Sequence, residues 1–233
     1  GAGLIGCEFT NDLLNGGFTV EAVDPMGWCL PTLLPEQSGR AVQAALEEKG
    51  ATFHFGPLAT EVNRVGEGYA VTLNNGDTIE ADAVLCAVGV RPRTTLASDA
   101  GIEVNRGIVT DRQLRTNAPN VYAMGDCAEV AGHVLVYVAP LMAAARALAA
   151  TLAGETTDVS YPAMPVAIKT PACPVVVSPP AKDADGEWHF EGDAPDIKAL
   201  FRSGAGELLG FALTGQAVKE RMALAKELPA ILG

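Results

Sequence analysis

The stretch GAGLIGCE at residues 1–8 decides the fold, because it has the G-x-G-x-x-G spacing of a dinucleotide-binding turn. In such a turn the first glycine shapes the backbone, the second lets a pyrophosphate approach the main chain, and the third lets helix and strand pack closely. Gly1, Gly3 and Gly6 are therefore predicted to bind a cofactor at the start of a helix. A buried strand normally delivers this turn, so we expect such a strand, and the first part of a longer protein, upstream of Gly1. A glycine-rich packing turn is the alternative interpretation.

The residues that follow alternate between helix and strand patterns. Apolar residues recur at helical spacing from Leu4 to Leu14, and residues 18–23 form a strand pattern that ends at Asp24. Asp24 stands about 20 residues beyond the glycines, where a carboxylate accepts the ribose hydroxyls of NADH and repels the 2′-phosphate of NADPH. We therefore predict that Asp24 selects NADH. A solvated turn aspartate is the alternative.

The rest of the chain carries further strand and helix patterns. These are a helix at 35–49, a meander at 59–65, 69–73 and 78–80, a buried parallel strand at 83–88 that stops at Gly89, a strand at 121–124, a helix at 140–152, strands at 166–169, 175–178, 188–191, 197–202 and 208–214, and a helix at 217–228. The fold class predicted is α/β, with domains at residues 1–93, 94–158 and 159–233.

Composition narrows the function classes. The formal net charge of −12 and the lack of clustered lysine or arginine disfavour nucleic acid as a partner. No apolar stretch is long enough to span a bilayer, so membrane insertion is not expected. The five cysteines show no close pair in the sequence, which argues against a metal site or a disulfide framework and favours a cytoplasmic protein.

A second segment with chemistry is TNAPNVYAMGD at residues 116–126, where an apolar strand pattern runs into Gly125 and Asp126. Taken alone, Gly-Asp is a common turn. Together with the opening GxGxxGxE, the acidic strand end at Asp24 and the apolar run into Gly89 and Pro92, however, the order of motifs resembles the FAD-dependent pyridine-nucleotide oxidoreductases. The resemblance implies a Rossmann-like NADH-binding domain, a returning segment of an FAD-binding domain and a C-terminal α+β domain.

The resemblance also implies roles for individual residues. Glu8 would line the nicotinamide side, although an acidic residue is also common early in a helix. Asp126 would bind the ribityl chain of FAD, and Gly89 and Gly125 would also belong to the cofactor-binding residues. The helix from Pro140 would aim its N-terminus at the flavin, with the Val138 backbone nearby, and a plain core helix is compatible with this. The implied cofactors are FAD and NADH, and no side chain is expected to act as a catalytic acid or base.

The C-terminal segment from Ala163 to Val177 resembles rubredoxin reductases and, more loosely, flavorubredoxin reductases. This implies an NADH-dependent flavoprotein that reduces the electron carrier rubredoxin, with the isolated piece inactive. Lys169 would approach the flavin, whereas a lysine that ends an apolar strand is otherwise a surface residue. A ferredoxin or flavorubredoxin reductase and a non-catalytic NADH-binding regulatory module are the alternatives.

Overall fold

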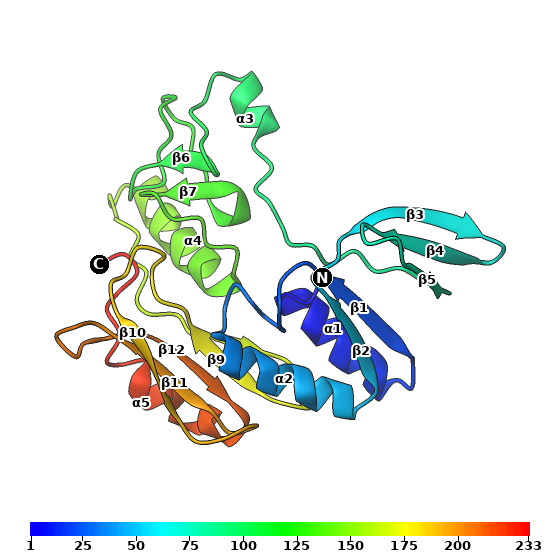
Figure 1. The fold of residues 1–233 in the computed structure, drawn as a ribbon. Coiled ribbons are helices and arrows are strands. Elements are labelled where there is room, and N and C mark those ends of the chain that lie inside the picture. Colours follow the sequence, from blue (N-terminus) through cyan, green and yellow to red (C-terminus); the bar gives the residue numbers. More distant parts are fainter. The chain divides into compact units, whose positions relative to one another are not determined.

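The computed structural model describes residues 1–233 and divides them into two compact units. The first unit comprises Gly1–Gly89 with Pro165–Leu228, and the second comprises Val90–Met164 with Pro229–Gly233 (Figure 1). Each unit has its own buried apolar cluster. The mixture of helices and strands is the α/β class expected from the sequence. The three-domain division stays a prediction.

The first unit opens with a β/α arrangement that is close to the expected one. Helix α1 spans Leu4–Asn15, strand β1 spans Val20–Asp24 and helix α2 spans Glu36–Glu48. Strand β2, Ala51–Phe55, pairs in parallel with β1 and was not predicted. Its β-forming residues, which directly follow Gly50, are the signal that could have found it.

The structure confirms the predicted meander after β2, but the prediction of a strand directly after the meander is wrong. Strands β3 (Ala59–Val65), β4 (Gly68–Leu73) and β5 (Thr78–Ala81) form an antiparallel sheet in that order. Residues 83–88 form no strand and are mostly exposed. No strand of the structure pairs with them, and an apolar run without a hydrogen-bonding neighbour has no ladder to join.

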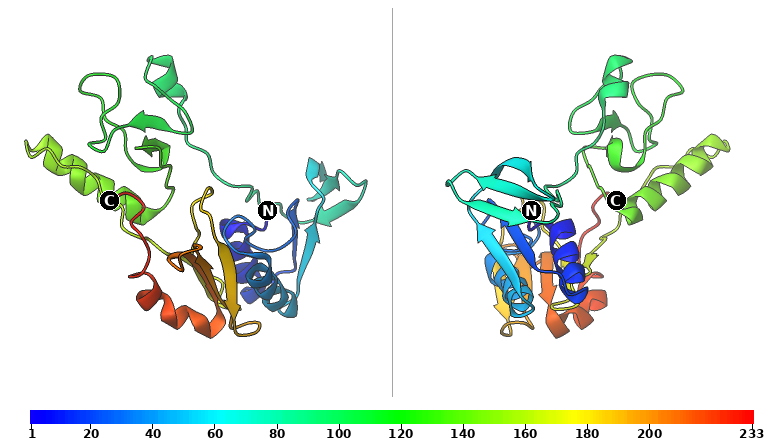
Figure 2. Two further views of the ribbon diagram at one scale, coloured as in Figure 1. Left: turned by 60° about the vertical axis from the view of Figure 1, so that its left-hand side comes forward. Right: turned by 90° about the vertical axis from the view of Figure 1, so that its right-hand side faces the viewer.

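The C-terminal part of the first unit is an antiparallel sheet with the order β10-β11-β12-β9-β8. Its strands are β8 (Val166–Ile168), β9 (Val175–Ser178), β10 (Glu187–Glu191), β11 (Lys198–Arg202) and β12 (Leu208–Thr214). All five were predicted, with bounds that differ by one residue at most. In both views of Figure 2 the sheet lies beside α2, and α2 contacts both β2 and β12. The apolar cluster of this unit therefore runs through both of its chain segments.

The helix predicted for 217–228 is wrong in type and extent. A 3₁₀ segment covers Gly215–Glu220, and α5 covers only Arg221–Leu224. Ala217, Val218, Leu224 and Leu228 still pack on the sheet as their spacing suggests. The apolar pattern thus located the packing face but not the length of the helix.

The second unit holds α3 (Thr95–Asp99), β6 (Ile108–Thr110), the 3₁₀ turn η1 (Gly125–Cys127), β7 (Ala128–Val130) and α4 (Val138–Leu152). Strands β6 and β7 pair in parallel, and α4 confirms the predicted helix. The strand predicted at 121–124 is wrong, since only Tyr122 pairs, with Arg115. Ala123 N donates to Leu114 O and Thr116 N donates to Val121 O on either side of this single bridge, and Leu114 itself has a left-handed backbone with φ 63°. No helix in the chain has the length and apolar content needed to cross a bilayer.

Candidate functional site

The glycine turn at the start of α1 leaves room for a ligand at Gly3. Gly3 is the N-cap residue of α1, with φ −75°, and a Cβ added there would meet no atom within 4 Å. No side chain caps the helix and its first turn has no acidic residue. The first amide groups and the positive end of the helix dipole are thus available to an anion. This is the geometry that a pyrophosphate requires.

Gly1 and Gly6 serve close packing. A Cβ on Gly6 would overlap the carbonyl oxygen of Gly1, and a Cβ on Gly1 would overlap the carbonyl oxygen of Ala87. The chain can therefore pass this point only with glycine at both positions. Gly89 lies two residues beyond Ala87, is exposed and has φ +97°, a backbone conformation that favours glycine.

Asp24 holds the glycine turn directly. Its carboxylate accepts a hydrogen bond from Ala2 N at 2.7 Å through Oδ2 and another from Met26 N at 2.8 Å through Oδ1. The residue is only 8% exposed. Asp24 is therefore a buried partner of the glycine turn and not a solvated turn aspartate, and its binding of ribose hydroxyls stays a prediction.

A pair of thiols lies beneath the same turn, and the sequence did not reveal it. Cys7 and Cys29 are both fully buried, and the Cys7 thiol donates to Ala2 O at 3.2 Å. The hydrogen bond between the two thiols and their burial raise the pKa of Cys29 strongly. Leu30 N also donates to Ala2 O, at 2.8 Å. Ala2 is thereby fixed on both sides, by Asp24 at its N–H and by these groups at its carbonyl.

Glu8 and Lys169 are distant in the sequence but adjacent in the structure. The backbone N–H of Lys169, directly after β8, donates to Glu8 Oε1 at 2.8 Å. One turn further along α1, Asn11 Oδ1 accepts from Ala172 N at 3.0 Å. The Lys169 side chain is exposed and makes no ion pair. Its ammonium group therefore remains available to a ligand.

The other predicted cofactor residues lie in the second unit. Gly125 has φ +78° and begins η1, whose Asp126 is exposed. Asp126 thus precedes β7, instead of following a strand as the sequence suggested. The turn contacts α4, and a Cβ on Gly125 would approach Leu141 Cδ1 to 3.3 Å. Left-handed backbone and this close approach both favour glycine here.

Helix α4 presents a free N-terminus beside that turn. Its N-cap residue Tyr137 makes no capping bond, and the first turn contains no acidic residue. Val138, the first helical residue, is 75% exposed. An electron-rich group placed here would meet unsatisfied N–H groups and the positive end of the dipole. The residues present therefore fit the part of a flavin that takes up negative charge.

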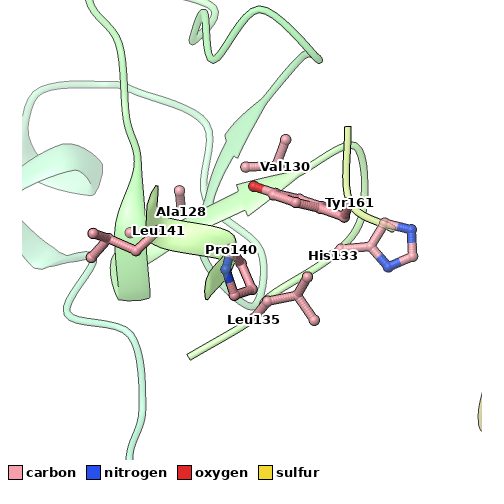
Figure 3. A pocket seen from close by; sticks show the side chains of 8 residues that line it. Ala128, Val130, His133, Leu135, Pro140, Leu141 and Tyr161 are labelled. Carbon is pink, nitrogen blue, oxygen red and sulfur yellow. The ribbon is translucent and has the colours of Figure 1, made fainter. Parts of the chain in front are cut away.

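A small pocket lies behind η1 and is shown in Figure 3. Its lining residues are Gly125, Ala128, Val130, His133, Leu135, Pro140, Leu141 and Tyr161. The cavity volume is about 10 Å³, which is roughly the room of one water molecule. Burial raises the pKa of the Tyr161 hydroxyl, so it stays protonated. The pocket is therefore too small for a cofactor.

A buried carboxylate braces the loop that leads into β6. Glu129 accepts from Asn105 Nδ2, Arg106 N and Gly107 N at 3.1, 2.9 and 3.1 Å. Burial opposes the charged form, but these hydrogen bonds outweigh it and lower the pKa of Glu129. Sequence reasoning missed this residue, because nothing in its local pattern marks a buried acid.

The predicted site residues thus form two groups. Gly1, Gly3, Gly6, Glu8, Asp24, Gly89 and Lys169 belong to the first unit, whereas Gly125, Asp126 and Val138 belong to the second. Within the first unit, Asp24 joins the glycine turn and Glu8 joins Lys169 through hydrogen bonds. Within the second, Gly125 and Asp126 lie in a turn that contacts the helix of Val138. Their roles in cofactor binding remain predictions.

Two family models match the chain in series. Residues 1–151 match the model described as pyridine nucleotide-disulphide oxidoreductase, and residues 158–228 match the rubredoxin binding C-terminal domain. The chain is 62% identical over 233 residues to a rubredoxin-NAD(+) reductase of Alcanivorax borkumensis, covering 100% of the chain and 61% of that protein. It is 38% identical over 228 residues to a nitric oxide reductase FlRd-NAD(+) reductase of Aliivibrio fischeri, covering 98% and 60%.

Solved structures share the fold. A ferredoxin reductase for the CYP199A2 system from Rhodopseudomonas palustris superposes with a TM-score of 0.85 at 25% identity, over 98% of this chain and 59% of that one. The covalent putidaredoxin reductase–putidaredoxin complex gives a TM-score of 0.85 at 21% identity, over 98% and 58%. Since the oxidoreductase model covers most of the chain, including both groups of site residues apart from Lys169, the chain belongs to the pyridine nucleotide-disulphide oxidoreductase family.

Proposed function

We propose that this chain is the NADH-binding and carrier-facing portion of an FAD-dependent NADH:rubredoxin reductase. The observation that carries the proposal is the order of the two matched models, an oxidoreductase segment followed by a rubredoxin-binding segment. The chain spans about three fifths of the length of the curated relatives it matches. We further propose that the protein acts in the cytoplasm, which suits its five free cysteines.

On the NADH side, the proposed roles follow from the geometry of the first unit. The pyrophosphate would lie over Gly3 at the start of α1, where the space is open and the amide groups are free. Asp24 would accept the ribose hydroxyls with the lone pairs that Ala2 and Met26 leave unused. Glu8 uses one oxygen for Lys169 N, so its other oxygen would orient the nicotinamide carboxamide.

On the flavin side, Asp126 would bind the ribityl chain, next to the left-handed backbone of Gly125. The free N-terminus of α4 at Val138 and the Lys169 ammonium would stabilise negative charge. When bound, FAD would supply the conversion between a two-electron donor and a one-electron acceptor. The protein's own residues then act by holding and orienting, without a catalytic acid or base.

Titration of the chain with NADH, followed by quenching of tryptophan fluorescence, tests the NADH half of the proposal. Gly3→Ala should weaken NADH binding at least tenfold, because its methyl group would occupy the space of the pyrophosphate. The φ of −75° suits alanine and no atom lies within 4 Å of the added Cβ, so the variant should fold as the native chain does. Unchanged NADH affinity in a folded Gly3→Ala chain would exclude this site.

Reduction of electron-carrier proteins tests the part of the proposal that concerns the electron acceptor. In the FAD-loaded protein, NADH-dependent reduction of rubredoxin should be faster than that of ferredoxin at equal concentration. The similarity to a nitric oxide reductase FlRd-NAD(+) reductase favours that protein's acceptor as the second candidate, and faster reduction of that acceptor would replace rubredoxin in the proposal. NADH binding without reduction of any carrier would instead indicate a regulatory module.

A further inference from the structure

Two side chains of α1 hold a turn of the C-terminal part of the first unit. Glu8 Oε1 accepts from Lys169 N at 2.8 Å, and Asn11 Oδ1 accepts from Ala172 N at 3.0 Å. The two acceptors are three residues apart on α1 and therefore share one face of the helix. The two donors lie at the two ends of the segment 169–172, which leads from β8 into the turn that Cys173 N closes onto Thr170 O. Helix α1 thus holds this segment by two hydrogen bonds, which we call the grip.

Asn11 is an unusual residue for its surroundings. It is 0% exposed, and Ala172, from whose N–H it accepts a hydrogen bond, packs against the apolar cluster that joins α1, α2 and the C-terminal sheet. Its Nδ2 group is buried without a hydrogen-bond partner. A buried donor without a partner costs stability, which an apolar side chain of the same size would avoid. The hydrogen bond that Asn11 Oδ1 accepts from Ala172 N is therefore the feature that distinguishes Asn11 from a packing residue.

Hydrogen bonds within the segment that follows β8 also restrain its backbone, including that of Lys169. Thr170 Oγ1 donates to Cys173 O at 2.7 Å, and Cys173 N donates back to Thr170 O at 2.9 Å. Thr170 N also bonds to Ile168 O, at the end of β8. With its backbone closed internally and held at both ends, the turn has little freedom. The exposed Lys169 side chain starts from this fixed backbone.

We propose that Asn11, together with Glu8, is a positioning residue for Lys169. The inference rests on the proposed flavin role of the lysine. Because α1 begins at the glycine turn, one helix would place the NADH pyrophosphate at its start and Lys169 through its second and third turns. The distance between the bound dinucleotide and Lys169 would then be set by the length of α1, which rises about 1.5 Å per residue.

Hydrogen–deuterium exchange on the chain tests the grip itself. Asn11→Leu removes both the acceptor and the orphan donor at nearly constant size, and the exchange at Ala172 should become roughly tenfold faster, as expected for the loss of one hydrogen bond. Ser38→Ala is the matched control, since the Ser38 hydroxyl of α2 is also fully buried without a partner but lies outside the turn. It should leave exchange in residues 169–172 unchanged. Equal acceleration throughout the unit by Asn11→Leu would make Asn11 a plain core residue.

The reduction potential of bound FAD tests the positioning role in the FAD-loaded protein. Lys169→Met should lower this potential, because it removes a positive charge near the flavin. Asn11→Leu should shift it in the same direction, and should add nothing in a Lys169→Met background. Faster local exchange with an unchanged potential in Asn11→Leu would overturn the positioning role. If Lys169→Met itself leaves the potential unchanged, the flavin role of Lys169 in the proposed function fails, while the exchange result still decides whether the grip exists.

Discussion

Replacement of Asp24 by asparagine tests both the structural role of this residue in the glycine turn and its proposed role in binding NADH. In the native chain both carboxylate oxygens accept backbone N–H groups, from Ala2 and from Met26, and the side chain is buried. Asparagine has the same shape but only one acceptor oxygen. In Asp24→Asn, the amide nitrogen therefore faces one of these donors, and that N–H loses its partner.

The magnitude follows from the two bonds. One hydrogen bond to a charged acceptor is lost with a buried donor left unsatisfied, and the other is weakened from charged to neutral. Together these changes should lower the free energy of unfolding by about 2 to 4 kcal/mol. NADH binding should fall as well, because the glycine turn loses the group that holds Ala2 N. Removal of the negative charge should also weaken discrimination against NADPH.

Urea denaturation followed by tryptophan fluorescence measures the first effect, and fluorescence titration with NADH and NADPH measures the second. Asp12→Asn is the control: it makes the same change of charge at an exposed position of α1 and should alter stability by less than about 0.5 kcal/mol. An Asp24→Asn chain with an unchanged urea midpoint and improved NADPH binding would refute the reasoning. It would show that Asp24 only selects the nucleotide and does not hold the turn.

Two further changes probe the turn and the second unit. Gly6→Ala should lower the free energy of unfolding by about 1 to 3 kcal/mol in urea denaturation, because its Cβ would overlap the Gly1 carbonyl; stability equal to that of Gly3→Ala would contradict this. Glu129→Gln should cost about 2 kcal/mol at neutral pH. Since the folded pKa of Glu129 lies below its ordinary 4.5, the native carboxylate stabilises the fold above pH 4.5 and loses this effect as the pH falls through the folded pKa. The difference between native and variant should therefore shrink in acid, and a pH-independent difference would argue against the charged bonds.

Local patterns predicted most elements of the fold where a segment is stabilised by its own periodicity. Helices α1, α2 and α4 were predicted because their apolar residues repeat at helical spacing, and the meander was predicted because its turns carry glycine and asparagine. The apolar run at 83–88 failed as a strand because no strand pairs with it, and the run at 121–124 makes only one isolated bridge, between Tyr122 and Arg115. Periodicity contains no information about a strand's pairing partner.

The candidate site divides in the same way. Gly1, Gly3, Gly6 and Asp24 could be predicted as cofactor-binding residues because their spacing is itself the signature of a dinucleotide turn. The contacts that Asn11 makes with Ala172 and Cys7 makes with Cys29 join residues far apart in the sequence. Neither residue type is unusual in its local context, so only the tertiary structure reveals them. The same holds for Glu129, whose burial depends on the loop at 105–107.

The residue types at Asp24 and Glu8 also follow from these contacts. Each carboxylate has a structural partner in the chain, Ala2 and Met26 for Asp24 and Lys169 N for Glu8. A carboxylate offers about four acceptor positions, so it can keep these bonds and still accept hydroxyl or amide donors from a nucleotide. An amide oxygen or a hydroxyl has two, so fewer positions remain for a ligand once the structural bonds are made. With the proposed nucleotide roles, a carboxylate at both positions would let the ligand bind while the turn keeps its structural hydrogen bonds.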